Sequence, residues 1–463
     1  MSGSVRAKLS VMMFLQFFIW GAWYELAFGY VRDLGFSSWQ QSLALITFNL
    51  AAFTAMFFST QFADRHFAAE KFLAFSHLLG GLSILAAGWV TSFWPFFLLL
   101  LVHSLCYVPT LSIANSIAFA SLKDAQRDFG LVRVWGTIGW IAASWPFIFI
   151  LVDWSQVPAL GDVGFVSWIG QALATSKEGA ARTVGVSWTY IVAGISSLVL
   201  AGYSLSLPHT PPKPAEAGGE ALAWLGAMKL LRLPFLMVLF VVTFLDASVL
   251  QCYFLWTDPF LRGIGVPSNW VMPAMKVSQI AEIGTMAFLG YFLTRLGWRA
   301  TMILGILGHV LRFGIFAWVG NVSQPGTTEI WAAVAINLVH GICYAFFFAT
   351  LYIFVDEYFP KDARSSAQGL FNFLILGAGP LVGNFLWPWL GDKLFTTTIE
   401  AGKPLVQFNH LFLVPSATAL VAALLLLLFF HPPNKVEPKM EQVPVSPEEP
   451  EDFAARPRPD LAQ

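Results

Sequence analysis

The sequence has few charged residues and few cysteines. Asp, Glu, Lys and Arg make up 11% of the 463 residues, whereas a soluble domain usually carries about 25%. Cys106, Cys252 and Cys343 each lie in an apolar run and form no CxxC pair, which argues against a disulfide framework and a metal site. The net charge of −1 offers no basic surplus for a nucleic-acid partner. These features exclude the common soluble and nucleic-acid-binding classes.

Two kinds of catalytic signature are also missing. No GxxxxGK[ST] loop is present to hold nucleotide phosphates, and no HExxH pair is present to hold a metal. The eight histidines are scattered along the chain, whereas a metal enzyme gathers its ligands. We therefore expect no metal and no cofactor, and these absences weigh against an enzyme, a polytopic membrane enzyme included.

Apolar and aromatic residues dominate what is present. Hydrophobic residues make up 57% of the chain, the mean hydropathy is +0.67, and there are 44 Phe and 19 Trp. A helix needs about 20 apolar residues to cross a bilayer. Runs of this kind predict an all-α integral membrane protein with twelve transmembrane helices, centred near residues 20, 50, 82, 106, 141, 196, 244, 283, 308, 343, 377 and 419.

A Pro-, Gly- and charge-rich stretch divides these helices into two groups of six. We predict an N-terminal bundle over residues 1–206, a cytoplasmic linker over 207–232 and a C-terminal bundle over 233–431. Residues 432–463 are too poor in apolar residues to fold and predict a disordered tail. Most loop Lys and Arg residues fall on the side of the N-terminus, so both termini are predicted to be cytoplasmic.

The two predicted bundles share a weak repeat. FADRHFAAEKFLA (62–74) follows the second helix of the first bundle, and FLTRLGWRATMIL (292–304) follows the second helix of the other. In this arrangement the chain resembles the major facilitator superfamily. The resemblance implies a substrate site near the membrane midplane, between the bundles, and alternating access by rocking of one bundle against the other.

Charged residues inside the predicted helices are few, and each is costly to bury in a bilayer. They are Glu25, Arg133, Asp246, Lys276, Glu282 and Arg312. Gln279 and Glu282 lie three residues apart and share one helix face, where they could bind hydroxyl or amide groups of a polar solute. The alternative is a structural ion pair between Glu282 and Arg312 or Lys276.

Arg133 and Thr137 lie four residues apart and also share a helix face. Arg133 either lines a cavity or reaches back to water at the cytoplasmic interface. Glu25 has the same two interpretations: a buried acid that carries a proton, or an interfacial carboxylate that meets water where its helix ends.

Six segments resemble the bacterial nucleoside:H+ symporter family and occur in its order. They are FLQFFIWGAW (14–23), YVPTLSIANSI (107–117), RVWGTIGW (133–140), SQIAE (278–282), LRFGIFA (311–317) and ARSSAQGLF (363–371). The resemblance implies that the substrate is bound by residues in both bundles, namely Arg133, Thr137, Gln251, Gln279, Glu282 and Tyr344.

The chain departs from the family pattern at three positions. Ala345 follows Tyr344 where the family has an aspartate, Phe254 stands at a polar position, and Glu25 replaces a neutral residue. We therefore hypothesise that Glu25 or Glu282 carries the proton. The departures leave the solute open among a purine nucleoside, a pyrimidine nucleoside and a sugar-like relative.

The sequence thus predicts a secondary active transporter that imports nucleosides by proton symport in the cell inner membrane. The alternative is a proton-coupled symporter of sugars or another small polar metabolite. The expected partners are the nucleoside, the proton and the lipid bilayer, with no nucleic acid. The oligomeric state is left open, and a monomer is compatible with this interpretation.

Overall fold

The structure is a computed structural model that describes residues 3–58, 67–122, 125–212, 232–358, 361–398 and 404–432. Met1–His431 form one unit and Pro432–Gln463 form another. We call residues 3–212 the first half and residues 232–431 the second half. The predicted tail and most of the predicted linker lie outside the described residues, so the predicted bundle boundaries stay predictions.

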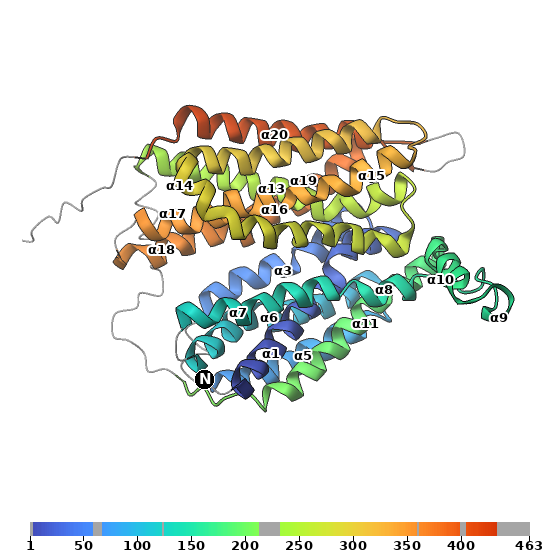
Figure 1. The fold of residues 1–463 in the computed structure, drawn as a ribbon, viewed down its shortest axis with the longest axis horizontal. Helices are drawn as coiled ribbons and strands as arrows, with labels where there is room; N and C mark the ends of the chain where they lie inside the picture. Colours follow the sequence, from blue (N-terminus) through green and yellow to red (C-terminus); the bar gives the residue numbers. More distant parts are fainter. Residues whose placement is uncertain are drawn as a thin grey trace, which may run out of the picture. The chain divides into compact units, whose positions relative to one another are not determined.

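The first half contains six helical passages among its described residues (Figure 1). Two are interrupted: Pro146 marks the break between α7 and α8, and η1 separates α1 from α2 at Glu25. The passages are α1 (Gly3–Trp23) with η1 (Tyr24–Leu26) and α2 (Ala27–Asp33), α3 (Ser38–Phe58), α5 (Ala69–Ala87), α6 (Phe93–Ser121), α7 (Ala125–Ala142) with α8 (Trp145–Ile150), and α11 (Gly179–Ser204). Two short helices, α9 (Leu160–Val163) and α10 (Phe165–Ala174), precede α11.

The second half repeats this count with more irregular helices. Its elements are α13 (Pro234–Gly263), α14 (Ser268–Gly320), α15 (Thr327–Ala335), η4 (Ile336–Leu338), α16 (Val339–Cys343), η5 (Tyr344–Ala349), α17 (Thr350–Tyr358), α18 (Lys361–Asn372), η6 (Phe373–Ala378), α19 (Gly379–Trp389), η7 (Leu390–Leu394), β1 (Thr396–Thr398), β2 (Pro404–Val406) and α20 (Phe408–Phe429). The two strands pair antiparallel with Thr396 opposite Val406. The sequence did not predict this short sheet.

The long α14 is two helices joined at Gly297. This residue has φ 73° and ψ 175°, a conformation that a side chain disfavours. The predicted centres near residues 283 and 308 therefore both fall within α14, on either side of the break. Counting α14 as two passages makes the second half consistent with six, like the first.

The prediction of an all-α membrane protein is confirmed. Eight helices in the described part are long and apolar enough to span a membrane, α14 counted once among them. Every predicted helix centre lies within a helical element. Helices suit this environment because they satisfy their backbone hydrogen bonds internally.

Several helices of the first half contact helices of the second half. α3 contacts α19, α13 contacts α2, and α14 contacts α7 and α8. α1 begins and α20 ends at the same end of the helices (Figure 1), which we call the terminus end; the opposite one is the far end. Within the first half, α7 approaches α1 so closely that a Cβ on Gly139 would overlap the carbonyl oxygen of Phe14. This contact fixes the face of α7 that points between the halves.

Candidate functional site

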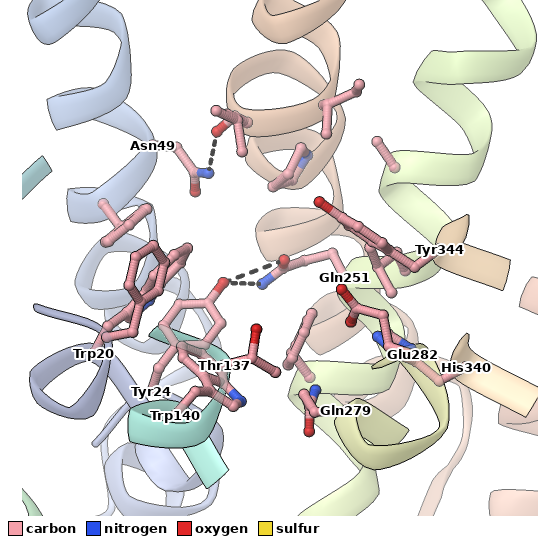
Figure 2. A pocket seen from close by; sticks show the side chains of 18 of the residues that line it. Trp20, Tyr24, Asn49, Thr137, Trp140, Gln251, Gln279, Glu282, His340 and Tyr344 are labelled. Atoms are coloured by element: carbon pink, nitrogen blue, oxygen red, sulfur yellow. Dashed lines mark hydrogen bonds between the residues drawn. The ribbon is translucent and has the colours of Figure 1, made fainter. Parts of the chain in front are cut away.

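A cavity of ≈ 250 Å³ lies between the halves (Figure 2). It is lined by residues from α1, α3 and α7 of the first half and from α13, α14, α16, η5 and the helices that follow in the second. All six residues predicted to bind substrate line it: Arg133, Thr137, Gln251, Gln279, Glu282 and Tyr344. The structure therefore brings these residues, from distant parts of the chain, around one space.

Arg133 lines the cavity between the halves. Its guanidinium carbon lies 4.0 Å from the centroid of the Phe17 ring on α1, and the face of an aromatic ring attracts a cation. Among the described residues, no carboxylate lies within ion-pair distance of Arg133. The guanidinium is thus held by packing, and its N–H donors face a space that a ligand can fill.

Gln279 and Glu282 reach the cavity from the second half, one helical turn apart on α14. Gln279 is buried, and its Oε1 accepts no hydrogen bond from any described residue. Figure 2 shows the side chains of Gln279, Glu282 and Thr137 directed into the same pocket. The alternative that Glu282 pairs with Arg312 or Lys276 is wrong, because the ion pairs of the described residues do not include Glu282.

A chain of amide groups connects the two halves beside the cavity. The Gln251 amide lies 3.5 Å from the Tyr24 hydroxyl across the halves, as the dashed lines in Figure 2 mark. Gln251 Nε2 donates to Asn384 Oδ1 at 2.9 Å. Asn384 in turn donates to Asn49 Oδ1 of the first half at 2.8 Å, and Asn49 donates to the carbonyl oxygen of Leu376 at 2.9 Å. Gln251 is therefore oriented by partners on both sides.

Aromatic rings form one wall of the cavity. Trp20 stacks on Phe48, with centroids 4.8 Å apart and planes 15° apart. Trp140 meets Trp20 edge to face at 5.1 Å. All three rings belong to the first half and line the cavity. A planar ligand can stack against such a wall while its polar edge faces the amides and charged groups opposite.

Tyr344 begins the π-helical segment η5, and its neighbour Ala345 points elsewhere. Tyr344 lines the cavity. Ala345 is fully buried in a separate small cluster with Leu289 and Phe346. Where the family that the sequence resembles has an aspartate, this chain therefore has an alanine that packs against Leu289 of another helix.

Glu25 is not interfacial. It is fully buried in η1, where the first passage is interrupted, and Lys276 of α14 lies 3.1 Å away in an ion pair between the halves. The Lys276 ammonium also donates to the carbonyl oxygen of Gly21 at 3.3 Å and lies 4.1 Å from the centroid of the Trp140 ring. Glu25 is not among the residues that line the cavity, whereas Trp140, which contacts its partner Lys276, is.

The sequence reasoning did not select several lining residues, and three polar or aromatic examples are Trp140, His340 and Asn49. Trp140 lies three residues after Thr137 and His340 lies four before Tyr344. Helical spacing from residues already chosen could have identified both. Asn49, in contrast, is one amide within an apolar run, and nothing in its sequence neighbours marks it.

The chain matches the family model described as nucleoside H+ symporter over residues 3–160 and 152–435. The chain belongs to the nucleoside H+ symporter family. A putative nucleoside transporter of Escherichia coli, YegT, is 30% identical over 429 residues, covering 92% of this chain and 93% of that protein. The xanthosine permease of Escherichia coli is 26% identical over 452 residues, covering 94% and 98%.

Solved structures share the fold of this family member. The crystal structure of the nucleoside transporter NupG superposes with a TM-score of 0.75 at 23% identity, covering 92% of this chain and 98% of that one. A D-xylose–proton symporter superposes with a TM-score of 0.63 at 14% identity, covering 92% and 98%. The fold is that of the major facilitator superfamily. As a member of the nucleoside H+ symporter family, the chain is a multi-pass proton-coupled transporter and not an enzyme.

Proposed function

We propose that this chain imports nucleosides together with protons across the inner membrane, and that the cavity between the halves is the substrate site. The observation that carries this proposal is that both halves contribute polar side chains to one cavity, Arg133 and Thr137 from one and Gln251, Gln279 and Glu282 from the other. A solute that contacts both halves is sensitive to their relative movement, which alternating access requires.

The lining chemistry supports a nucleoside as the ligand. Trp20 and Trp140 offer ring faces for a base, and base–aromatic stacking contributes about 1–3 kcal/mol in nucleic-acid systems. A guanidinium, two amides and a carboxylate offer both donors and acceptors to ribose hydroxyls and base edges. In this account Arg133 and Glu282 bind hydroxyl or base atoms, while Gln251 and Gln279 read the polar edge of the base.

Two carboxylates are proposed to couple the proton to the solute. Glu282 lines the cavity, so a proton bound there is adjacent to the ligand. Glu25 faces Lys276 across the halves, so a proton bound there would remove one charge of a contact that links them. One proton moving with a neutral solute supplies about 2.3 kcal/mol per 100 mV of membrane potential.

We further propose that both termini lie in the cytoplasm, so that the far end opens to the cell exterior. We also propose that the protein acts as a monomer without cofactor, metal or nucleic acid.

Uptake into proteoliposomes tests the proposal. A radiolabelled purine and pyrimidine nucleoside panel is supplied with and without an imposed pH gradient, and free ribose and free bases serve as competitors. A one-unit gradient should support up to about tenfold accumulation of a nucleoside cotransported with one proton. Nucleoside uptake that no gradient stimulates would remove symport from the account, and competition by ribose alone would favour the sugar alternative.

A further inference from the structure

A buried polar cluster in the second half touches the cavity at a single residue, His340. Its members are Asp246 on α13, His309 and Arg312 on α14, and His340 on α16. The first three are fully buried and His340 is 3% exposed. Arg312 lies between the two histidines: one of its terminal nitrogens donates to His340 Nδ1 at 2.9 Å and the other donates to His309 Nδ1 at 2.8 Å.

These hydrogen bonds determine which ring nitrogen of each histidine carries the hydrogen. An arginine guanidinium only donates, so both Nδ1 atoms must accept, and the hydrogen of each neutral ring is on Nε2. In His309 this Nε2 faces Asp246, whose Oδ1 lies 3.6 Å away. In His340, Nδ1 accepts the hydrogen bond from Arg312, so Nε2–H is the donor that remains for a ligand in the cavity.

The surroundings of Arg312 hold its guanidinium beside the cavity. Arg312 lies 4.2 Å from the centroid of the Tyr253 ring, and the carboxylate of Asp246 faces it through the His309 ring. Neither oxygen of Asp246 has a hydrogen-bond partner among the described residues. Asp246 is thus the acidic side chain that faces Arg312 across the ring of His309.

The His340 ring is fixed in orientation as well as in tautomer. It stacks on Tyr253 with centroids 5.3 Å apart and planes 28° apart, and Phe254 meets it edge-on at 6.4 Å. Figure 2 shows His340 on the same side of the pocket as Glu282 and Tyr344. Because Tyr253 packs on one face of the His340 ring and Arg312 binds Nδ1, the direction of Nε2–H is fixed.

We propose that His340 is a further substrate-binding residue, which donates a hydrogen bond from Nε2–H to an acceptor atom of the nucleoside. Arg312 is its positioning residue, anchored in turn by His309 and Asp246. The inference rests on the proposed function, since it takes the cavity ligand to be a nucleoside. It adds a requirement that the other lining groups do not impose: the substrate must carry a ring nitrogen, a carbonyl oxygen or a sugar oxygen at this position.

Paired substitutions at His340 separate ligand binding from a merely structural role. The amide nitrogen of glutamine can replace Nε2, whereas the amide of asparagine can replace only Nδ1. If His340 contacts the nucleoside, His340→Asn and His340→Phe should raise the Kd about tenfold, as for a lost buried hydrogen bond, and His340→Gln should recover most of the affinity. Binding of a radiolabelled nucleoside to purified protein measures this.

A panel of deaza- and deoxynucleosides identifies the acceptor. The analogue that lacks the acceptor atom should bind the wild type about tenfold more weakly than the parent nucleoside does. Its affinity should be the same for His340→Phe as for the wild type, because the atom that His340 would contact is already missing. For Arg312, nitrogen-15 spectra of labelled histidine should show Nε2–H at His340 in the wild type and a mixture of tautomers in Arg312→Gln.

Three results would overturn the inference while leaving the proposed function intact. The first is equal nucleoside affinity in the wild type and all His340 variants, and the second is tighter binding by His340→Asn than by His340→Gln. The third is that every analogue binds His340→Phe more weakly than the parent nucleoside does, to the same degree as in the wild type. If the wild type binds no nucleoside at all, the proposed function fails and this inference fails with it.

Discussion

The guanidinium of Arg182, in the first half, donates a 2.8 Å hydrogen bond to the carboxylate of Asp258, in the second half. Arg182 is 1% exposed and Asp258 is fully buried. Asp33 also binds Arg182, and Arg262 lies 3.1 Å from Asp258. These residues belong to the far-end segments of α2, α11 and α13. The halves are therefore joined at the far end by opposite charges, which must separate before a solute can enter there.

Asp258→Asn is expected to favour the state that is open at the far end. Arg262 and Arg182 then lose their shared carboxylate, and removing one partner of a buried pair typically costs about 3–5 kcal/mol. Spin labels at Ser37 and Lys393, exposed positions in the first and second halves, measure the opening in a background without the native cysteines. The variant should shift the distance distribution to longer values. A distribution identical to that of the parent would show that this contact does not hold the far end closed.

Glu25 and Lys276 should show strong thermodynamic coupling. Glu25→Gln leaves a buried ammonium and Lys276→Met leaves a buried carboxylate, so each single change should destabilise the protein by about 3–5 kcal/mol. The double variant buries no charge at this contact and should be more stable than the sum of the single changes implies. Thermal unfolding in detergent measures all four proteins. Additive losses would mean that the two side chains do not interact.

Glu282→Gln and Glu25→Gln should both weaken the response of uptake to a pH gradient. An amide cannot take up the proton that a carboxylate exchanges, so gradient-driven accumulation should fall while exchange of internal for external nucleoside continues. Glu357→Gln, an exposed position, is the matched control and should behave like the wild type. Full gradient-driven accumulation in both variants would remove both carboxylates as proton carriers.

Arg133→Lys should lower nucleoside affinity although the charge is retained. Lysine lacks the planar donor fork that packs on Phe17 and can bind two acceptors at once. We expect the Kd to rise about tenfold or more, as for the loss of a charge-assisted hydrogen bond. Arg295→Lys, at an exposed position, should leave the Kd unchanged. Equal affinity in Arg133→Lys and the wild type would indicate that the guanidinium does not contact the ligand.

Gly297→Ala should destabilise the second half. The residue has φ 73° and ψ 175° between the two parts of α14, a region that glycine alone adopts readily and where another residue costs about 1–3 kcal/mol. Gly290→Ala is the matched control, because a Cβ there would meet open space and alanine favours a helix by about 1 kcal/mol. A lowered unfolding temperature for the first variant and an equal or raised one for the second are expected. The reverse order would contradict the helix break assigned to Gly297.

Much of the fold could be predicted because the bilayer restricts the options. Each of the twelve apolar runs long enough to span it is centred within a helical element of the described residues, and helical spacing placed Gln279 beside Glu282. Contacts between the halves could not be predicted in the same way. Lys276 pairs with Glu25 from 251 residues away, and Asn384 binds Asn49 from the other half. Such pairs depend on how two bundles pack, which local spacing does not encode.

The interruptions of the helices were equally hidden. From the sequence, the burial of Glu25 depends on where the first helix ends. In the structure the chain continues through η1 into α2, so this carboxylate lies inside the protein. The π-helical η5 turns Tyr344 toward the cavity and Ala345 toward Leu289. A first helix that ends near Tyr24 gives the wrong depth for Glu25, because the passage continues to Asp33.

The central claim is that one solute is held by both halves at once. A structure of the protein with a bound nucleoside tests it most directly. We predict that the nucleoside lies in the cavity of Figure 2 and contacts Arg133 or Thr137 of the first half together with Gln279 or Glu282 of the second. A nucleoside bound to one half alone, or outside this cavity, would contradict the account.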